Sequence, residues 1–299
     1  MLLVVFCIFF ITKKHCNYKS NNKKTSKYNS TSCKHFNSNK YKHKIVFLAK
    51  LKNDFRMKKT KTAIVFGATS GIGKNLTELL VKDNYIVAIT GRRLEKLEGL
   101  KKQYPNQIIV RQNDITQIND LEKSFNDLVE ELGEVHLIIH SSGVGEVNSE
   151  LSWGVENKTV QTNVVGATKL YGLAYNLFRK QQFGHLVGIS SIASLRGNRA
   201  APSYFASKAY QKAYLESLYI KTKSIKSKKV FITDIRPGFI DTAMALGDGI
   251  FWMVSLEKAT NQIYSAIKRK KRIAYISKRW RLIAWVLKVV PARLLKVAT

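Results

Sequence analysis

The sequence has little cysteine, few acidic residues and no long apolar run, and each shortage excludes a class of protein. Its three cysteines, Cys7, Cys16 and Cys33, all lie in the first 56 residues. The rest of the chain therefore cannot hold a disulfide framework or a cysteine metal site, which is in keeping with a reducing compartment. His136 and His140 lie about 13 Å apart along an expected strand, too far to share a metal ion, so no metal site is expected.

The apolar run at the N-terminus, residues 1–12, is shorter than the roughly 20 residues that a membrane-spanning helix needs. It also lacks the basic residues before it and the small residues after it that mark a signal peptide. Residues 13–44 are rich in Lys, Asn, Ser and Tyr without a period, so they are expected to be disordered. Met57 begins a stretch that resembles an ordinary protein start. Residues 1–56 are therefore expected to be a basic extension outside the fold, either translated from an upstream start or a weak targeting tail.

Acidic residues are scarce, because 20 Asp and Glu stand against 51 Lys and Arg and give a formal net charge of +31. Such a charge is typical of a nucleic-acid binder. Yet residues 57–256 carry 26 basic and 18 acidic residues, whereas residues 1–56 carry 13 and 1 and residues 257–299 carry 12 and 1. The excess lies at the two ends and no nucleic-acid-binding motif accompanies it, so no nucleic-acid partner is expected.

The C-terminal segment, 278–299, is expected to form a basic amphipathic helix. On a helical wheel its apolar residues share one face and basic residues oppose them, namely Ile283, Val286, Leu287 and Val290 against Arg281 and Lys288. Such a helix, with two Trp at its fringes, suits the surface of an anionic membrane. The alternative is a helix that packs on the domain itself or at an oligomer interface. The expected location is the cytoplasm, with peripheral membrane contact under the first interpretation.

Residues 57–277 alternate short β-branched apolar runs with longer helical patterns. The expected strands are residues 63–66, 85–89, 107–110, 136–139, 185–189, 230–235 and 272–276. The expected helices are residues 72–82, 94–103, 118–132, 155–179, 203–222 and 257–268. This alternation predicts an α/β fold, a single doubly wound, Rossmann-like domain with a seven-stranded parallel sheet and helices on both faces.

A glycine-rich turn follows the first expected strand, where the chain must enter the first helix. It runs from Gly67 through Ala68, Thr69, Ser70, Gly71 and Ile72 to Gly73. Glycines allow a tight turn and a close approach of backbone to a pyrophosphate, which then faces the helix N-terminus. The spacing is G-x-x-x-G-x-G, so the motif alone leaves open a dinucleotide site and a mere tight turn.

Two further features favour a dinucleotide. Arg92 and Arg93 follow the second expected strand, where no acidic residue is present to hold the 2′-hydroxyl of NAD. Basic residues at this place suit a 2′-phosphate and therefore NADP, the alternative being a solvated helix start. Asp114 follows the third expected strand and would lie at the carboxyl edge of the sheet, within reach of an adenine amino group.

A phenol and an amine stand four residues apart in one helical pattern. Tyr204 and Lys208 therefore emerge on the same face of that helix. A free tyrosine has a pKa of about 10, and a nearby cation lowers it toward the range of a general acid or base. Ser191, which follows the fifth expected strand, would bring a hydroxyl to the same edge of the sheet, where it can hydrogen-bond a carbonyl oxygen.

Together these motifs resemble the short-chain dehydrogenase/reductase family over residues 60–277, in its NADP-preferring branch. The matching residues are Gly67, Gly71, Ile72, Gly73, Asp114, Gly143, Asn163, Ser191, Tyr204, Lys208, Pro237, Gly238 and Thr242. After the fourth strand the family has Asn-Asn-Ala-Gly, whereas this chain has His140, Ser141, Ser142 and Gly143. The small residues keep room for a cofactor, but the asparagine contacts to neighbouring strands are lost.

The resemblance implies a catalytic tetrad. Tyr204 would exchange a proton with the substrate oxygen and Ser191 would position that oxygen. Lys208 would lower the pKa of the tyrosine and bind the nicotinamide ribose, and Asn163 would hold a water that relays protons to Lys208. The resemblance also implies a cofactor site that Thr69, Ser70, Arg92, Arg93, Ser142, Pro237, Gly238 and Thr242 complete, with Thr242 at the carboxamide.

The resemblance implies an NADP-dependent oxidoreductase that transfers a hydride between nicotinamide and a carbonyl or alcohol. Residues 243–254 form an apolar segment with glycine hinges at the place of the family's substrate lid. They favour a lipophilic substrate, the alternative being ordinary packing of the segment on the core. An NAD-dependent alcohol dehydrogenase of the same family is the second interpretation, and a cofactor-binding protein at a membrane surface without turnover is the third. The expected assembly is a homo-oligomer.

Overall fold

The computed structural model describes residues 60–241 and 252–291. The chain divides into two units, residues 1–57 and 58–299, and everything described here belongs to the second. The expected basic extension at 1–56 lies outside the described residues. So do Thr242 and most of the expected lid.

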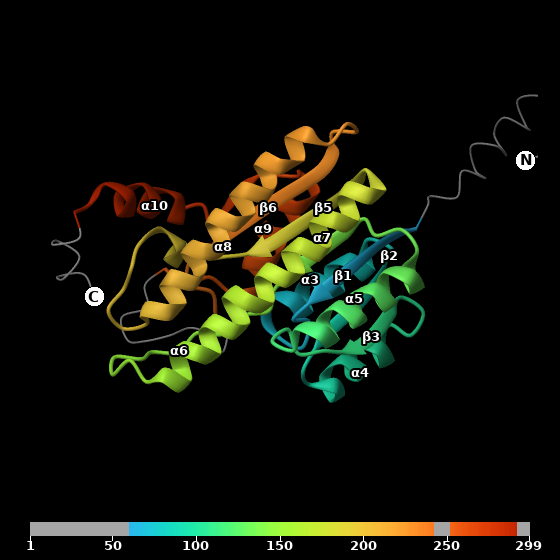
Figure 1. Ribbon diagram of the computed structural model, residues 1–299, viewed down its shortest axis with the longest axis horizontal. Coiled ribbons are helices and arrows are strands. Elements are labelled where there is room, and N and C mark those ends of the chain that lie inside the picture. Colours follow the sequence, from blue (N-terminus) through green and yellow to red (C-terminus); the bar gives the residue numbers. More distant parts are fainter. Residues whose placement is uncertain (1–59, 242–251, 292–299) are drawn as a thin grey trace, which may run out of the picture. The chain divides into compact units, whose positions relative to one another are not determined.

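The described residues form one seven-stranded sheet in the order β3-β2-β1-β4-β5-β6-β7 (Figure 1). Every neighbouring pair of strands is parallel. The strands are β1 Lys61–Phe66, β2 Tyr85–Gly91, β3 Ile108–Gln112, β4 Leu137–His140, β5 Phe183–Ile189, β6 Lys229–Pro237 and β7 Ile273–Ile276. The predicted seven-stranded parallel sheet is confirmed.

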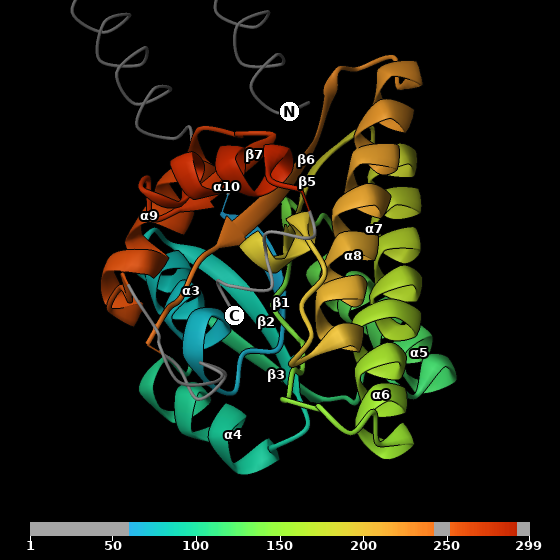
Figure 2. The same cartoon turned by 90° about the vertical axis from the view of Figure 1, so that its left-hand side faces the viewer.

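Helices cover both faces of the sheet, as Figure 2 shows. The first face carries α3 Gly71–Lys82, α4 Leu94–Gln103 and α9 Leu256–Lys268. The second carries α5 Ile118–Leu132, α7 Ala167–Gln181 and α8 Pro202–Lys221. The predicted doubly wound arrangement is therefore confirmed as well.

The alternation of side chains along β1 divides the core into two layers. Ala63 and Val65 are fully buried in the cluster with α3, α4 and α9. Ile64 and Phe66 are buried in the cluster with α5, α7 and α8. Because successive side chains of a strand point to opposite faces, a strand that is buried on both sides must be apolar throughout. This explains why the strands are recognisable as short apolar runs.

The order of the strands sets the place of the site. From β1 the chain moves outward to β2 and β3, and then returns to place β4 on the other side of β1. In open α/β sheets ligands bind at such a switch point, beyond the carboxyl ends of the strands. The glycine-rich turn follows β1, the Ser142–Gly143 pair follows β4 and Ser191 follows β5, so all three are brought to this edge.

The single helix expected at residues 155–179 is interrupted. It consists of α6 Trp153–Val160, a π-helical turn Gln161–Gly166 and α7. The widened turn contains Asn163, whose side-chain amide bonds the backbone of Val144 in the loop beyond β4. A π-turn inside an α-helix often marks a functional position, and apolar periodicity alone does not reveal it.

The C-terminal helix, α10 Trp280–Val289, has one side buried and another exposed. Trp280 and Ala284 are buried, and three of the four residues of the expected apolar face are half-buried, namely Ile283, Leu287 and Val290. The exposed apolar residues are Leu282, Trp285, Val286 and Val289. The sequence left open whether this helix packs on the domain or lies on a membrane, and the helical wheel alone did not show which of its apolar residues would be exposed. None of the helices within the described residues has the length and apolar character to cross a bilayer.

Candidate active site

Three glycines shape the loop between β1 and α3. Gly67 and Gly71 have φ angles of +88° and +56°, in the left-handed region that favours glycine. A Cβ on Gly67 would lie 2.6 Å from the backbone nitrogen of Ser142, and a Cβ on Gly73 would lie 2.1 Å from the carbonyl oxygen of Gly67. Glycine at these positions therefore lets the loop fold tightly against β4 and lead into the N-terminus of α3, whose free N–H groups suit a pyrophosphate.

An arginine from the end of β2 reaches this loop. The Arg93 guanidinium donates hydrogen bonds from Nη2 to Thr69 Oγ1 at 2.7 Å and to Ser70 Oγ at 2.9 Å. Arg92 and Arg93 are both exposed. The structure thus brings Thr69, Ser70 and Arg93, three predicted cofactor residues, to one corner of the carboxyl edge.

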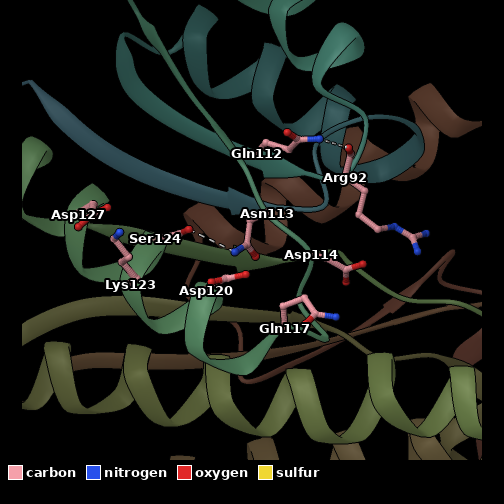
Figure 3. A pocket seen from close by; sticks show the side chains of 9 residues that line it. All are labelled: Arg92, Gln112, Asn113, Asp114, Gln117, Asp120, Lys123, Ser124 and Asp127. Atoms are coloured by element: carbon pink, nitrogen blue, oxygen red, sulfur yellow. Dashed lines mark hydrogen bonds between the residues drawn. The ribbon is translucent and has the colours of Figure 1, made fainter.

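A cavity of about 530 Å³ lies beside this corner, at the carboxyl end of β3 (Figure 3). Arg92 and Asp114 both line it, and a second hollow of about 310 Å³ shares these two residues. Asp114 Oδ1 accepts hydrogen bonds from the backbone nitrogen and the hydroxyl of Thr116, at 3.0 and 2.9 Å. These bonds fix the carboxylate at the wall of a space that suits a nucleotide base. Both hollows lie at the nucleotide end of the site and do not include Tyr204.

Ser191 stands directly after β5 and is buried. Its Oγ accepts a hydrogen bond from the backbone nitrogen of Ala193 at 3.1 Å and donates a long one to the carbonyl oxygen of Pro237 at 3.5 Å. A hydrogen bond with Ser191 also acts on the Tyr204 hydroxyl, where it lowers the pKa of the tyrosine. The structure therefore brings Ser191 and Tyr204 together, as the resemblance implies.

Tyr204 and Lys208 lie on the same face of α8. Lys208 Nζ lies 5.8 Å from the centre of the Tyr204 ring. The ring is packed against the loop beyond β4, because a Cβ on Gly145 would lie 2.5 Å from Tyr204 Cδ2. Lys208 is buried and its ammonium donates to the carbonyl oxygen of Ile189, at the end of β5, at 3.1 Å.

The pKa of Tyr204 is shifted upward, whereas the sequence predicted that a nearby cation would lower it. Burial of the hydroxyl raises the pKa of Tyr204, and the hydrogen bond with Ser191 opposes that rise. Burial lowers the pKa of Lys208 to about 8, against an opposing effect of the Asp234 carboxylate. The sequence pattern placed a cation near the phenol but did not include the desolvation of both groups, and desolvation disfavours the charged form of each.

Asn163 is fully buried in the π-helical turn. Its Oδ1 accepts from the backbone nitrogen of Val144 at 2.9 Å, and its Nδ2 donates to the carbonyl oxygen of Val144 at 2.7 Å and to Ser207 Oγ at 3.0 Å. The side chain thus joins the loop beyond β4 to α8. A Cβ on Gly143 would lie 3.4 Å from both Asn163 Oδ1 and Lys208 Nζ, so these groups gather around Gly143.

At the end of β4, His140 stands where the family has the first asparagine of Asn-Asn-Ala-Gly, and this histidine makes contacts of its own. His140 is fully buried and shares a hydrogen bond of 2.8 Å between its Nδ1 and Tyr171 Oη. Burial lowers the pKa of His140 to about 3, with a smaller contribution from the Lys208 charge, so the imidazole is neutral. Its contact runs to α7 and the second core layer, where Tyr171 is packed.

Pro237 ends β6 beside Ser191 and Gly238 follows it, with an aromatic side chain behind the glycine. A Cβ on Gly238 would lie 2.1 Å from the indole of Trp280. The Trp280 ring centre lies 5.5 Å from that of Phe239 and 6.4 Å from that of Trp252. An aromatic cluster from three segments thus borders the expected substrate side. Thr242, the last predicted cofactor residue, lies outside the described residues.

Two features of the site were missed from the sequence. Gln211 is fully buried and donates and accepts hydrogen bonds within the tetrad, and its position three residues after Lys208 on one helix could have drawn attention to it. Asp234 and Arg236 form a buried ion pair on β6, with a distance of 2.6 Å between Oδ2 and Nε. Ser190 Oγ bonds the same carboxylate, and this network supports the strand end that carries Ser191.

The comparisons with known proteins agree with this geometry. Residues 61–248 match the short chain dehydrogenase family. Carbonyl reductase family member 4 of Xenopus tropicalis is 30% identical over 202 residues, which cover 66% of this chain and 84% of that protein. A short chain dehydrogenase from Burkholderia cenocepacia in complex with NADP has a TM-score of 0.68 at 19% identity, covering 79% of this chain and 96% of its own. One from Burkholderia phymatum in complex with NAD has a TM-score of 0.68 at 16% identity, covering 76% and 92%.

The chain belongs to the short-chain dehydrogenase family. It is accordingly an oxidoreductase that acts with a nicotinamide cofactor, NAD or NADP. The glycine-rich loop at α3 and the cavity beside Asp114 fit such a dinucleotide, since one suits a pyrophosphate and the other a base.

Proposed function

We propose that the protein is an NADP-dependent reductase of lipophilic carbonyl compounds, with Tyr204 as the general acid. The observation that carries the proposal is the convergence of Ser191, Tyr204 and Lys208 beside Gly143, next to a glycine-rich loop that holds Arg93. When bound, the cofactor supplies the hydride that the substrate carbon receives. The relative from Xenopus tropicalis, whose name describes a carbonyl reductase, supports the same reaction class.

In this proposal the residues of the chain handle the proton and the oxygen. The Ser191 hydroxyl holds the carbonyl oxygen of the substrate, and the Tyr204 hydroxyl donates its proton to that oxygen as negative charge develops there. The Lys208 ammonium stabilises the phenolate that remains. Because burial raises the pKa of Tyr204, the hydroxyl keeps its proton at neutral pH, and this protonation state suits the direction of reduction.

Support for NADP comes from the corner beside the glycine-rich loop. The Arg93 guanidinium, held by Thr69 and Ser70, has further donors free in its planar fork for a 2′-phosphate. Arg92 adds positive charge at the wall of the neighbouring cavity. A lipophilic substrate is favoured by the aromatic cluster of Phe239, Trp252 and Trp280 beyond Pro237 and Gly238.

The direct test is oxidation of NADPH and NADH in parallel, against aldehydes and ketones graded by chain length. We expect kcat/KM to rise with the apolar length of the substrate and to be larger with NADPH than with NADH. A preference for NADH, or turnover only in the direction of alcohol oxidation with NAD, would favour the second interpretation from the sequence. Binding of NADPH without turnover of any carbonyl would favour the cofactor-binding protein instead.

We propose further that α10 rests on an anionic membrane surface. Its outward face exposes Leu282, Trp285 and Val289, with exposed fractions of 72%, 67% and 58%. Basic residues flank that face, namely Lys278, Arg279, Arg281 and Lys288, all of which are exposed. Apolar residues with a basic border are the combination that binds the headgroup region of anionic lipids. The helix also contacts the segment that follows Ser191. That segment is the short helix Ile192–Leu195, and Arg196 comes directly after it. Arg196 Nε donates a hydrogen bond to the carbonyl oxygen of Leu287 in α10 at 2.5 Å.

Replacing Leu282 and Trp285 with serine is expected to abolish co-flotation with anionic vesicles. Each of the two substitutions removes about 1.5–3 kcal/mol of the free energy gained by burying an apolar side chain in the membrane. This corresponds to a decrease of tenfold or more in the partition coefficient per residue. Ile220→Ser is the matched control, because Ile220 is an apolar residue of α8 with 62% exposure. Flotation that the double variant leaves intact contradicts the proposal. If the double variant instead halves the mass in analytical ultracentrifugation without affecting flotation, the face is an oligomer contact.

A further inference from the structure

A buried glutamine lies between two members of the tetrad. Gln211 is fully buried on α8, one turn beyond Lys208. Its Oε1 accepts a hydrogen bond from Lys208 Nζ at 3.1 Å, and its Nε2 donates one to the backbone carbonyl oxygen of Asn163 at 2.8 Å. One side-chain amide thus bridges the active-site ammonium to the π-helical turn.

This bridge limits the directions open to the Lys208 ammonium, which has three N–H donors. One donates to the carbonyl oxygen of Ile189 on β5 and one to Gln211. The remaining donor is the one available to the space around Gly143 and Tyr204. Gln211 therefore fixes which of the three points toward the substrate side.

The same amide also fixes the π-helical turn. The side-chain amide of Asn163 is already used on the backbone of Val144 and on Ser207. Gln211 Nε2 bonds the backbone carbonyl oxygen of the same residue. A buried hydrogen bond that joins α8 to the turn costs stability when it is removed, so the glutamine contributes to keeping this turn in place.

We propose that Gln211 is a positioning residue of this active site, which orients the Lys208 ammonium by bridging it to the backbone carbonyl of Asn163. The resemblance implies a proton-relaying water between Asn163 and Lys208; in this chain the amide bonds one donor of Lys208 and the backbone carbonyl oxygen of Asn163. A primary amide accepts at one end and donates at the other, and does not pass a proton between them at neutral pH. The inference rests on the proposed function of Tyr204 and Lys208.

Few ionisable groups act on Lys208, which makes the effect of Gln211 measurable. Tyr204 faces it from its own helix, Asp234 from β6 and His140 from β4. Among the described residues the Asp234 carboxylate favours the ammonium by its charge, since His140 is neutral and Tyr204 keeps its proton near neutral pH. A change of charge at Gln211 is thus expected to move the titration of Lys208 directly.

Two substitutions of similar size separate positioning from mere packing. Gln211→Met removes both hydrogen bonds, and we expect kcat to fall about 10- to 100-fold, as for loss of a hydrogen bond to a charged group, with KM values changed less than about threefold. As the pH rises, kcat of this variant should begin to fall at a lower pH than kcat of the wild type. The reason is that the ammonium loses an acceptor, which lowers the pKa of Lys208. Gln211→Glu places a carboxylate against Lys208, so the decline should move about one unit or more to higher pH.

The deciding measurement does not require turnover. In protein labelled with [ε-¹³C]lysine, the Lys208 resonance is identified by its disappearance in Lys208→Met, and since burial lowers the pKa of Lys208 to about 8 we expect its midpoint there. We expect its midpoint to move down in Gln211→Met and up in Gln211→Glu, with thermal unfolding within a few degrees of wild type. Equal midpoints in all three proteins, or shifts of the same sign, overturn the inference. If Gln211→Met does not fold, the shift in Gln211→Glu alone decides. A wild type that reduces no carbonyl, but shows these shifts, contradicts the proposed function and leaves the bridge intact.

Discussion

Replacing Tyr204 with phenylalanine is expected to lower kcat for carbonyl reduction by about 10²- to 10⁴-fold, the range typical of a lost general acid. The change removes only the hydroxyl that the proposal assigns to proton donation. The ring remains packed against Gly145, so affinity for NADPH, measured by fluorescence titration, should change less than about threefold. Steady-state NADPH oxidation by purified wild type and variant checks the result.

Tyr210→Phe is the matched control for this experiment. Tyr210 lies on the same helix, and its hydroxyl shares a hydrogen bond of 2.7 Å with Thr168 Oγ1, outside the tetrad. Its loss should cost at most about 1 kcal/mol of stability and leave kcat within about twofold of the wild type. Equal activities of Tyr204→Phe and wild type would contradict the role of Tyr204 as the general acid.

The second large effect is expected from reversing a charge at the glycine-rich loop. Arg93→Asp removes the guanidinium that Thr69 and Ser70 hold and puts a carboxylate near the expected 2′-phosphate. It loses a charge-assisted contact of about 1.5–3 kcal/mol and adds repulsion, while an acidic residue at this place suits the ribose hydroxyl of NAD. The ratio of kcat/KM for NADPH to that for NADH should therefore fall by about 100-fold or more.

Lys96→Asp separates a local contact from a general effect of charge. Lys96 is exposed on α4, one turn beyond Arg93, and its substitution changes the net charge by the same amount. We expect the NADPH to NADH ratio to change less than about threefold in this variant. If both variants lower the ratio equally, long-range attraction decides the preference and Arg93 has no specific part in it.

Much of the fold follows from patterns that are local in the sequence. Runs such as Ile64, Val65 and Phe66 are apolar on both faces because the sheet is covered on both sides. The helices at residues 94–103 and 118–132 were predicted with the same bounds as α4 and α5. The π-helical turn at Asn163 was not, and the contact of this residue with Val144 lies in a loop that is distant in the sequence.

In the candidate site, too, local sequence patterns reveal some features, and contacts between distant segments determine the others. The glycines, Tyr204 and Lys208 are recognisable because steric need and helical spacing constrain neighbouring positions. The direction of the Tyr204 pKa was wrong, since it depends on burial by segments that no local pattern describes. Gln211 belongs to no motif. Its spacing of three residues places it beside Lys208, but only the packing of α8 on the π-helical turn brings it to the carbonyl oxygen of Asn163.

The orientation of α10 also lay beyond local patterns. Apolar residues occur around most of that helix, and the packing of Trp280 against Gly238 decides which of them face the domain. That packing joins segments about 40 residues apart in the sequence, so periodicity within the helix does not reveal it.

Hydride transfer from NADPH to a carbonyl carbon, with Tyr204 as the proton donor, can be followed by isotope labelling. The reaction is run with NADPH deuterated at the reactive C4 position and a medium-chain ketone, and the alcohol is analysed by mass spectrometry. We expect one deuterium on the carbinol carbon with the wild-type protein, and at least about 100-fold slower formation of the same labelled alcohol with Tyr204→Phe. Alcohol without deuterium, or labelled alcohol formed equally fast by both proteins, would contradict it.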